Sequence, residues 1–150
     1  MNFETDPVVE DFRARIRAFV DERIIPLEQD PDARDEGDNI SPARLEELRE
    51  LARKEGLWCL QLPENLGGRG LGKIGMAVCY EEMNRSIFGP VVFNSAAPDD
   101  GNMMVLAKAA TPEQQDKWLR PIAEGRVRSA FVMTEPHPGS GSDPAGMMRT

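Results

Sequence analysis

The sequence predicts an all-α fold, a bundle of about five helices, followed by the first strand and loop of a truncated β domain. Helix-start signals carry the first part of this prediction, because a capping residue and a first-turn proline recur before helically spaced apolar residues, at Asp6-Pro7, Ser41-Pro42 and Thr111-Pro112. The strand is predicted from a short apolar run, Ala130 to Met133, whose aromatic and β-branched content is typical of strands and which Pro136 follows. We therefore expect a helical domain over residues 1–126 and the incomplete start of a β domain over residues 127–150.

Composition indicates a soluble globular protein. Of the 150 residues 40% are hydrophobic and 29% are charged, and no apolar run approaches the ~18 residues of a membrane span. The N-terminus has no basic flank before an apolar core, so we expect no secretory signal and a cytoplasmic location. The net charge of −8 argues against nucleic acid or an anionic membrane as partner. Cys59 and Cys79 fit neither a disulfide framework nor a metal-ligand spacing, so we expect buried thiols and no metal site.

The first two predicted helices are amphipathic. The apolar stripe of the first consists of Val8, Phe12, Ile16, Phe19 and Val20. Charged residues lie off this stripe and are expected to face solvent: Arg13, Arg15, Arg17 and Asp21. Pro26 is expected to end the helix. The apolar stripe of the second helix consists of Leu45, Leu48, Leu51 and Ala52, and Gly56 closes it.

A glycine-rich loop separates the second helix from the third. Its run Gly68-Arg69-Gly70-Leu71-Gly72 superficially suggests a phosphate-binding loop. No clear strand precedes the run, and its spacing differs from that of a dinucleotide fingerprint. We therefore interpret the loop as structural.

The third helix is predicted from Ile74 to Ile87, with Gly89-Pro90 ending it. Its apolar positions are expected to be Ile74, Ala77, Val78 and Ile87, with Tyr80 and Met83 interleaved. The carboxylates Glu81 and Glu82 are adjacent in it and point about a quarter-turn apart, so they cannot converge on one atom for acid–base chemistry. We expect them to be solvated, or Glu81 to pair with Arg85.

The fourth helix is predicted to open at Pro98-Asp99 and to run to Ala110. Met103 and Met104 lie on it, and methionines suit either a pocket for varied apolar tails or plain core packing.

The fifth helix follows from Thr111-Pro112, where Gln114 completes a capping-box signal. Its inner side is expected to consist of Trp118, Leu119 and Ile122. Gly125 is expected to end the helix, after which the chain continues to the predicted strand.

The predicted strand is followed by a loop that contains Gly139, Ser140, Gly141 and Ser142. Such a loop allows close approach of a ligand and offers amides and hydroxyls to phosphate or carbonyl oxygens, as a nucleotide-like cofactor requires. We expect Gly141 to need such close approach or a positive φ. The alternative for the loop is a plain surface turn. His137 has no identifiable metal or acid partner and is interpreted as a loop residue.

The run Phe131-Val132-Met133-Thr134-Glu135-Pro136, followed by Gly141-Ser142-Asp143, resembles the flavin-binding signature of the acyl-CoA dehydrogenase family. Upstream segments are similar to the same family in order and spacing: Gly56-Leu57-Trp58, Leu62-Pro63-Glu64, Gly67-Gly68, Glu81 to Ser86, Ala97 to Met103 and Gln114 to Leu119. The run His137 to Ser140 is longer than the commonest family spacing, and the register of Gly141 and Ser142 depends on it.

The resemblance implies an oxidoreductase of fatty acid metabolism, a flavoprotein that dehydrogenates acyl-CoA thioesters between the α- and β-carbons with FAD as cofactor. It implies that Phe131, Met133 and Thr134 border the flavin ring, and that Gly141 and Ser142 approach the pyrophosphate or the thioester arm. It places Met103 and Met104 near the acyl chain. The partners it implies are acyl-CoA, an electron-transfer flavoprotein or similar acceptor, and further copies in a homo-oligomer.

Complete members of that family continue through a β domain and a second helical bundle that carries the catalytic carboxylate. We therefore expect the chain to correspond to their N-terminal third, the base to lie beyond Thr150, and the chain alone to be inactive. Two alternatives stay open: a flavin oxidase or monooxygenase on the same scaffold, and a non-catalytic helical module for assembly or acyl-chain binding.

Overall fold

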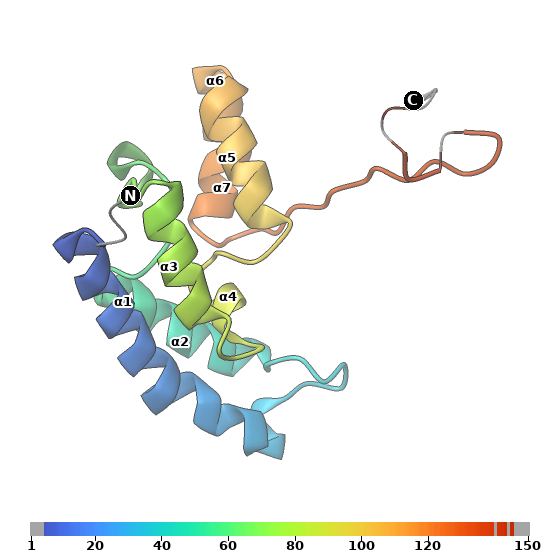
Figure 1. The fold of residues 1–150 in the computed structure, drawn as a ribbon. Helices are drawn as coiled ribbons and strands as arrows, with labels where there is room; N and C mark the ends of the chain where they lie inside the picture. The colour runs from blue at the N-terminus through green and yellow to red at the C-terminus, as the bar shows by residue number, and fades with distance from the viewer. Residues whose placement is uncertain (1–4, 140, 144, 146–150) are drawn as a thin grey trace.

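The computed structural model describes residues 5–139, 141–143 and 145, and it confirms the all-α fold class. One group of helices comprises α1 (Pro7–Phe19), α2 (Pro42–Lys54), α3 (Lys73–Met83) and the short α4 (Gly89–Val92). Beside it lie α5 (Asp99–Ala109), α6 (Pro112–Gln114) and α7 (Arg120–Ala123) (Figure 1). Shorter helical turns join these elements: Val20–Ile24, Ile25–Gln29, Pro31–Ala33, Glu64–Leu66 and Gln115–Leu119.

Helix α1 begins as predicted. The Asp6 carboxylate accepts a hydrogen bond of 2.8 Å from the Val8 amide, and Pro7 occupies the first turn. The stripe of Phe12, Ile16 and Phe19 is buried, whereas Val8 is exposed. The helix does not stop at Pro26, because a π-helical turn and a 3₁₀ turn carry the chain on to Gln29.

The prediction that Glu82 is solvated is wrong. Its side chain is only 1% exposed, because α3 packs this face against α1. Arg17 donates to it at 2.5 Å and 3.0 Å, and Arg13 donates at 3.1 Å. Both arginines were expected to face solvent. Arg17 is exposed as predicted and Arg13 is half-buried, but both guanidinium groups bind Glu82. Arg85 lies 3.6 Å from Glu82 and 2.7 Å from Asp21, and no such contact joins it to Glu81 among the described residues.

The prediction of the apolar positions of α3 is right for Met83 and wrong for Ile74 and Ile87. The buried residues of α3 are Gly75, Met76, Cys79, Glu82 and Met83. Ile74 is 81% exposed, and Ile87, which lies beyond the end of the helix, is 69% exposed. Apolar side chains follow one another so closely in this helix that helical spacing alone does not select one face. The small Gly75 selects it, because Val9 of α1 packs against that position.

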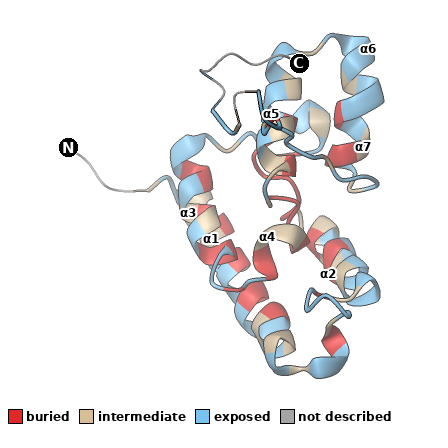
Figure 2. Ribbon diagram, turned by 90° about the vertical axis from the view of Figure 1, so that its right-hand side faces the viewer, coloured by how far each residue is buried: buried red, intermediate tan, exposed pale blue. Residues whose placement is uncertain are grey.

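Two buried clusters form the core (Figure 2). The larger lies among α1, α2, α3 and α4. The smaller consists of Trp58, Cys59, Leu62, Met103, Leu119, Ile122 and Ala123. Asn94 joins the loop before α5 to the second cluster: its buried amide donates to the Ile122 carbonyl at 2.9 Å and to Cys59 Sγ at 3.0 Å. This polar contact fixes the end of α7 against the rest of the domain.

The capping box at Thr111 and Gln114 is present as predicted. The prediction that Trp118 faces inward is wrong, since its side chain is 52% exposed while Leu119 is fully buried. The turn Gln115–Leu119 is π-helical, and this wider turn changes which residues of the helix face the core.

After α7 the chain leaves the helices as an extended segment, drawn in orange-red in Figure 1. The predicted strand from Ala130 to Met133 is not formed, because no strand among the described residues lies beside it to complete a ladder. Phe131 and Val132 are 69% and 86% exposed. We call residues 128–134 the exposed segment.

Candidate functional site

The exposed segment presents the residues that the flavin-like motif singled out. Phe131 and Thr134 are exposed, and Met133 is half-buried. After the segment a loop closes on itself: the Glu135 amide donates to the Gly141 carbonyl at 2.8 Å, and the Gly139 amide to the Pro136 carbonyl at 2.7 Å. An aromatic face, a hydroxyl and a closed turn thus lie within a few residues of one another.

Gly141 has a φ of +65°, so the expectation of a positive φ is confirmed. No heavy atom lies within 4 Å of the position that a Cβ would take, which leaves room for a ligand. Ser142 beside it is exposed. Ser140, whose register matters for this loop, lies outside the described residues.

The exposed segment is held by the first turns of α5. The Asp99 carboxylate is 2% exposed and accepts hydrogen bonds from the Ser129 amide at 2.6 Å, from the Ser129 hydroxyl at 2.7 Å and from Arg128. Asn102 donates to the Ser129 hydroxyl at 2.8 Å. Sequence reasoning treated Asp99 only as a helix-start residue and missed this role, because its partners lie about 30 residues away.

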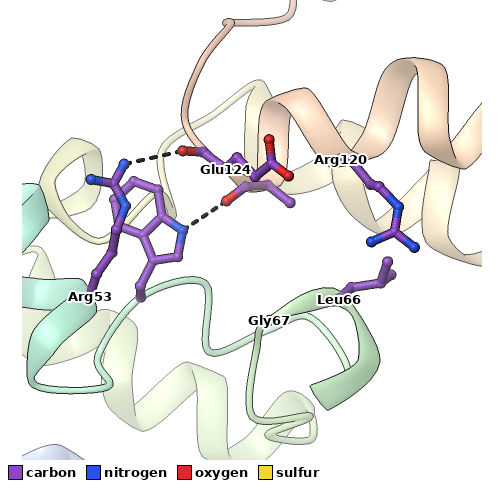
Figure 3. Close-up of a pocket in the computed structure, with 7 residues that line it drawn as sticks. Arg53, Leu66, Gly67, Arg120 and Glu124 are labelled. Carbon is purple, nitrogen blue, oxygen red and sulfur yellow. Dashed lines mark hydrogen bonds between the residues drawn. The ribbon is translucent and has the colours of Figure 1, made fainter.

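A second anchor holds the end of α7, where the chain turns towards this segment (Figure 3). The Trp58 indole donates to the Ala123 carbonyl at 2.8 Å, and Arg53 donates to the Glu124 carbonyl at 3.2 Å. The Arg53 guanidinium carbon lies 4.1 Å from the centroid of the Trp58 ring. A hollow of about 260 Å³ lies here, lined in part by Arg53 and Arg120. Both arginines bind carboxylates, Glu46 and Asp116, so we assign the hollow no ligand.

A larger groove of about 580 Å³ lies between α3 and α5. Its lining is mainly apolar and includes Met76, Ala77, Tyr80, Met104 and Val105. Met104 lines this groove, and its role towards an acyl chain stays a prediction. Met103 does not line this groove; it is fully buried in the smaller core cluster.

A hydrogen-bonded pair joins α3 to α5 beside this groove. The Tyr80 hydroxyl donates to Asp100 Oδ2 at 2.8 Å. Burial raises the pKa of the Tyr80 hydroxyl and the pKa of the Asp100 carboxyl, because the charged form of each loses solvation. Asp100 Oδ1 is buried and has no hydrogen-bond partner among the described residues.

The cysteines are buried free thiols, as predicted. Burial raises the pKa of Cys59 to about 12 and the pKa of Cys79 to about 11, so both are protonated and unreactive at neutral pH. Across the described residues, no group of three or more His, Cys, Asp or Glu side chains is placed to hold a metal ion. Within the same residues, no helix is both long and apolar enough to cross a membrane.

Comparison with known proteins gives consistent matches. Residues 7–126 match the family profile described as "Acyl-CoA dehydrogenase, N-terminal domain". The chain is 39% identical over 141 residues to "Acyl-CoA dehydrogenase family member 10" of Mus musculus, covering 89% of this chain and 13% of that protein. It is 45% identical over 106 residues to "Acyl-CoA dehydrogenase family member 11" of Gallus gallus, covering 71% of this chain and 13% of that protein.

A solved structure also matches, "Structure of a putative acyl-CoA dehydrogenase from Mycobacterium abscessus", with a TM-score of 0.80 and 38% identity. The match covers 92% of this chain and 37% of the solved chain. The chain therefore spans only a minor part of the length of the proteins that it matches.

Proposed function

Because the chain belongs to the acyl-CoA dehydrogenase family, we propose that it is the N-terminal portion of an FAD-dependent enzyme that dehydrogenates acyl-CoA thioesters between the α- and β-carbons. In this proposal residues 1–126 form the helical domain and residues 127–150 begin a β domain. An electron-transfer flavoprotein or similar acceptor, a homo-oligomeric assembly and a cytoplasmic location belong to the same proposal.

One observation supports this function most directly: α5 contacts the exposed segment and also lines the apolar groove. Asp99 and Asn102 of α5 hold the exposed segment, while Met104 and Val105 of the same helix line the apolar groove. Dehydrogenation requires the flavin ring and the acyl chain to lie against each other. A single helix that borders both the segment and the groove is suited to fix their relative position.

The exposed segment fits a flavin. Phe131 offers an exposed aromatic face for the ring system, and the Thr134 hydroxyl offers a hydrogen bond. Met133 would border the same ring, and Gly141 and Ser142 would lie near the pyrophosphate or the thioester arm. When bound, FAD supplies the acceptor for the hydride from the substrate β-carbon.

The groove fits an apolar acyl tail, with Met104 as its adaptable wall. Met103 is left out of this proposal because its side chain is 0% exposed. We assign no catalytic base. Three of the buried or half-buried carboxylates, Glu82, Asp99 and Asp100, are each bound to another side chain.

The test is anaerobic titration of the flavin-loaded complete enzyme, of which this chain is proposed to be the N-terminal portion, with acyl-CoA thioesters of increasing chain length. The complete enzyme is used because the chain alone is expected to be inactive. We expect the thioester to bleach the oxidised-flavin absorbance without added reductant, because the substrate itself reduces the flavin. Met104→Glu is expected to raise the concentration needed for long chains, since it places a charge in the apolar groove. Ile74→Glu is the control, because this exposed α3 residue lies outside the groove lining. Absence of bleaching with every chain length would contradict the proposal.

Thr134→Val is expected to weaken flavin binding or transition-state stabilisation by roughly 0.5 to 1.5 kcal/mol, the net contribution of one hydrogen bond. The exchange keeps the shape of the side chain and removes the hydroxyl. FAD affinity by calorimetry and turnover by acceptor reduction are the measurements, with Thr5→Val before α1 as the matched control. If Thr134→Val leaves both quantities unchanged, Thr134 is not part of the flavin site.

A further inference from the structure

We infer that Asp99 is a positioning residue, through which α5 sets the point and the direction in which the flavin-contacting segment leaves the helical domain. This inference rests on the proposed function for the role of the segment. It assigns to Asp99 no contact with flavin or substrate.

The Asp99 carboxylate is used for the segment and not for its own helix. Pro98 is the N-cap of α5 and makes no side-chain cap hydrogen bond, and Asp99 is the first residue of the helix. A first-turn acid commonly binds the free amides of its own helix. Here both carboxylate oxygens instead accept from Arg128 and Ser129, about 30 residues further along the chain.

In the contact between Asp99 and Arg128, only Asp99 is buried. Asp99 has a side-chain exposure of 3%, whereas the side chain of Arg128 is 51% exposed. A desolvated carboxylate binds its donors strongly, because water does not compete for it, and charge-assisted bonds add to this. Asn102 extends the contact, since it donates to the Ser129 hydroxyl, which in turn donates to Asp99.

The exposed segment has little else to hold it. Across residues 128–134, all of which are described, the hydrogen bonds to the helices end on Asp99 or Asn102. Phe131 and Val132 project into solvent and pack against no core cluster. The hydrogen bonds that fix the start of the segment, at residues 128–130, therefore come from these two α5 side chains.

Asp100 provides a matched control. It is the next residue of the same turn and carries the same charge, but its carboxylate binds Tyr80 of α3. Loss of either aspartate removes one acid from the first turn of α5. Only loss of Asp99 removes a contact to the exposed segment.

The experiment measures the distance between spin labels on Val132→Cys in the segment and Ala109→Cys at the end of α5, both exposed positions. The native thiols are buried and protonated, so the label reacts with the introduced cysteines. Asp99→Ala should broaden the distance distribution at least about twofold, because the tether of the segment is lost. Asp100→Ala should leave the width unchanged. Asp99→Asn keeps an acceptor for Ser129, so it should broaden the distribution less than Asp99→Ala does.

An unchanged width in Asp99→Ala, or equal broadening in Asp100→Ala, would overturn the inference. If circular dichroism shows that Asp99→Ala is unfolded, the double variant Arg128→Met/Ser129→Ala is used instead. It removes the side-chain hydrogen bonds that Arg128 and Ser129 donate to Asp99 and leaves the bond from the Ser129 amide. The same outcomes apply to it.

A second arm uses FAD with the same aspartate substitutions, without labels, in the complete enzyme of which this chain is proposed to be the N-terminal portion. Asp99→Ala should weaken FAD binding by about tenfold, the equivalent of one charge-assisted hydrogen bond, and alter the visible circular dichroism of the bound flavin. Asp100→Ala should change neither. Broadening of the segment with unaltered FAD binding would contradict the positioning role. Failure of the unmodified protein to bind FAD would instead refute the proposed function, while the distance measurement still decides whether Asp99 holds the segment.

Discussion

Gly68→Ala is expected to destabilise the helical domain by about 4 kcal/mol or more. A Cβ at this position would lie 2.0 Å from the Leu62 carbonyl oxygen and 2.5 Å from the Cys59 carbonyl oxygen. Both obstacles are backbone, so no side-chain rotation relieves the clash. Leu62 is fully buried, and any shift of its backbone would disturb the core around Trp58.

Gly67→Ala is the matched control for this effect. Gly67 has a φ of +86°, but nothing lies within 4 Å of its Cβ position, so only the backbone conformation penalises alanine, by about 1 kcal/mol. Chemical denaturation followed by circular dichroism gives the free energy of unfolding of each variant. If the two variants lose equal stability, the close packing at Gly68 does not limit the fold.

Backbone hydrogen bonds explain why the glycine-rich run from Gly68 to Gly72 is not a phosphate-binding loop. The Gly68 amide donates to the Pro63 carbonyl at 3.2 Å, and the Gly70 amide to the Leu62 carbonyl at 2.7 Å. These amides donate to carbonyl oxygens of the same loop and are not free to bind an anion. The interpretation of the loop as structural thus has a physical basis.

Glu82→Gln is expected to cost about 2 kcal/mol at neutral pH, within the range for loss of a hydrogen bond to a charged group. The carboxylate is buried between α1 and α3 and binds Arg13 and Arg17, which are partly exposed and regain water when the charge is lost. Glu81→Gln is the control, because Glu81 is the exposed neighbour on the same helix. Equal unfolding free energies for Glu82→Gln and the unmodified chain would contradict this account.

The contribution of Glu82 should depend on pH. Hydrogen bonds from Arg17 and Arg13, together with their charges, lower the pKa of the Glu82 carboxyl below its ordinary value of 4.5, although burial opposes the shift. The unfolded chain therefore binds a proton at a higher pH than the folded chain does. The stabilisation is complete above about pH 4.5 and is lost as the pH falls through the lowered pKa. Unfolding free energies measured from neutral to acidic pH should converge for the unmodified chain and Glu82→Gln.

The sequence by itself determined where α1 and α6 start, but not where α4 starts, since α4 begins at Gly89, where the sequence predicted a helix end. Asp6 before Pro7 and Thr111 before Pro112 cap their helices with bonds that span two or three residues. Such bonds form from local geometry alone, so a short window of sequence contains the whole cause. The positive φ at Gly141 was also anticipated from the sequence, because glycine adopts it without steric cost.

Only the tertiary structure decided which partners the charged side chains have and which face of α3 is buried. Glu82 lies 65 residues from Arg17 in the chain, and Asp99 lies 30 residues from Ser129. Contacts at such separations arise only when the packing of whole helices brings the residues together. The exposed segment shows the same dependence: its residues favour a strand, yet a strand forms only where another strand supplies hydrogen-bond partners, and the described residues contain none.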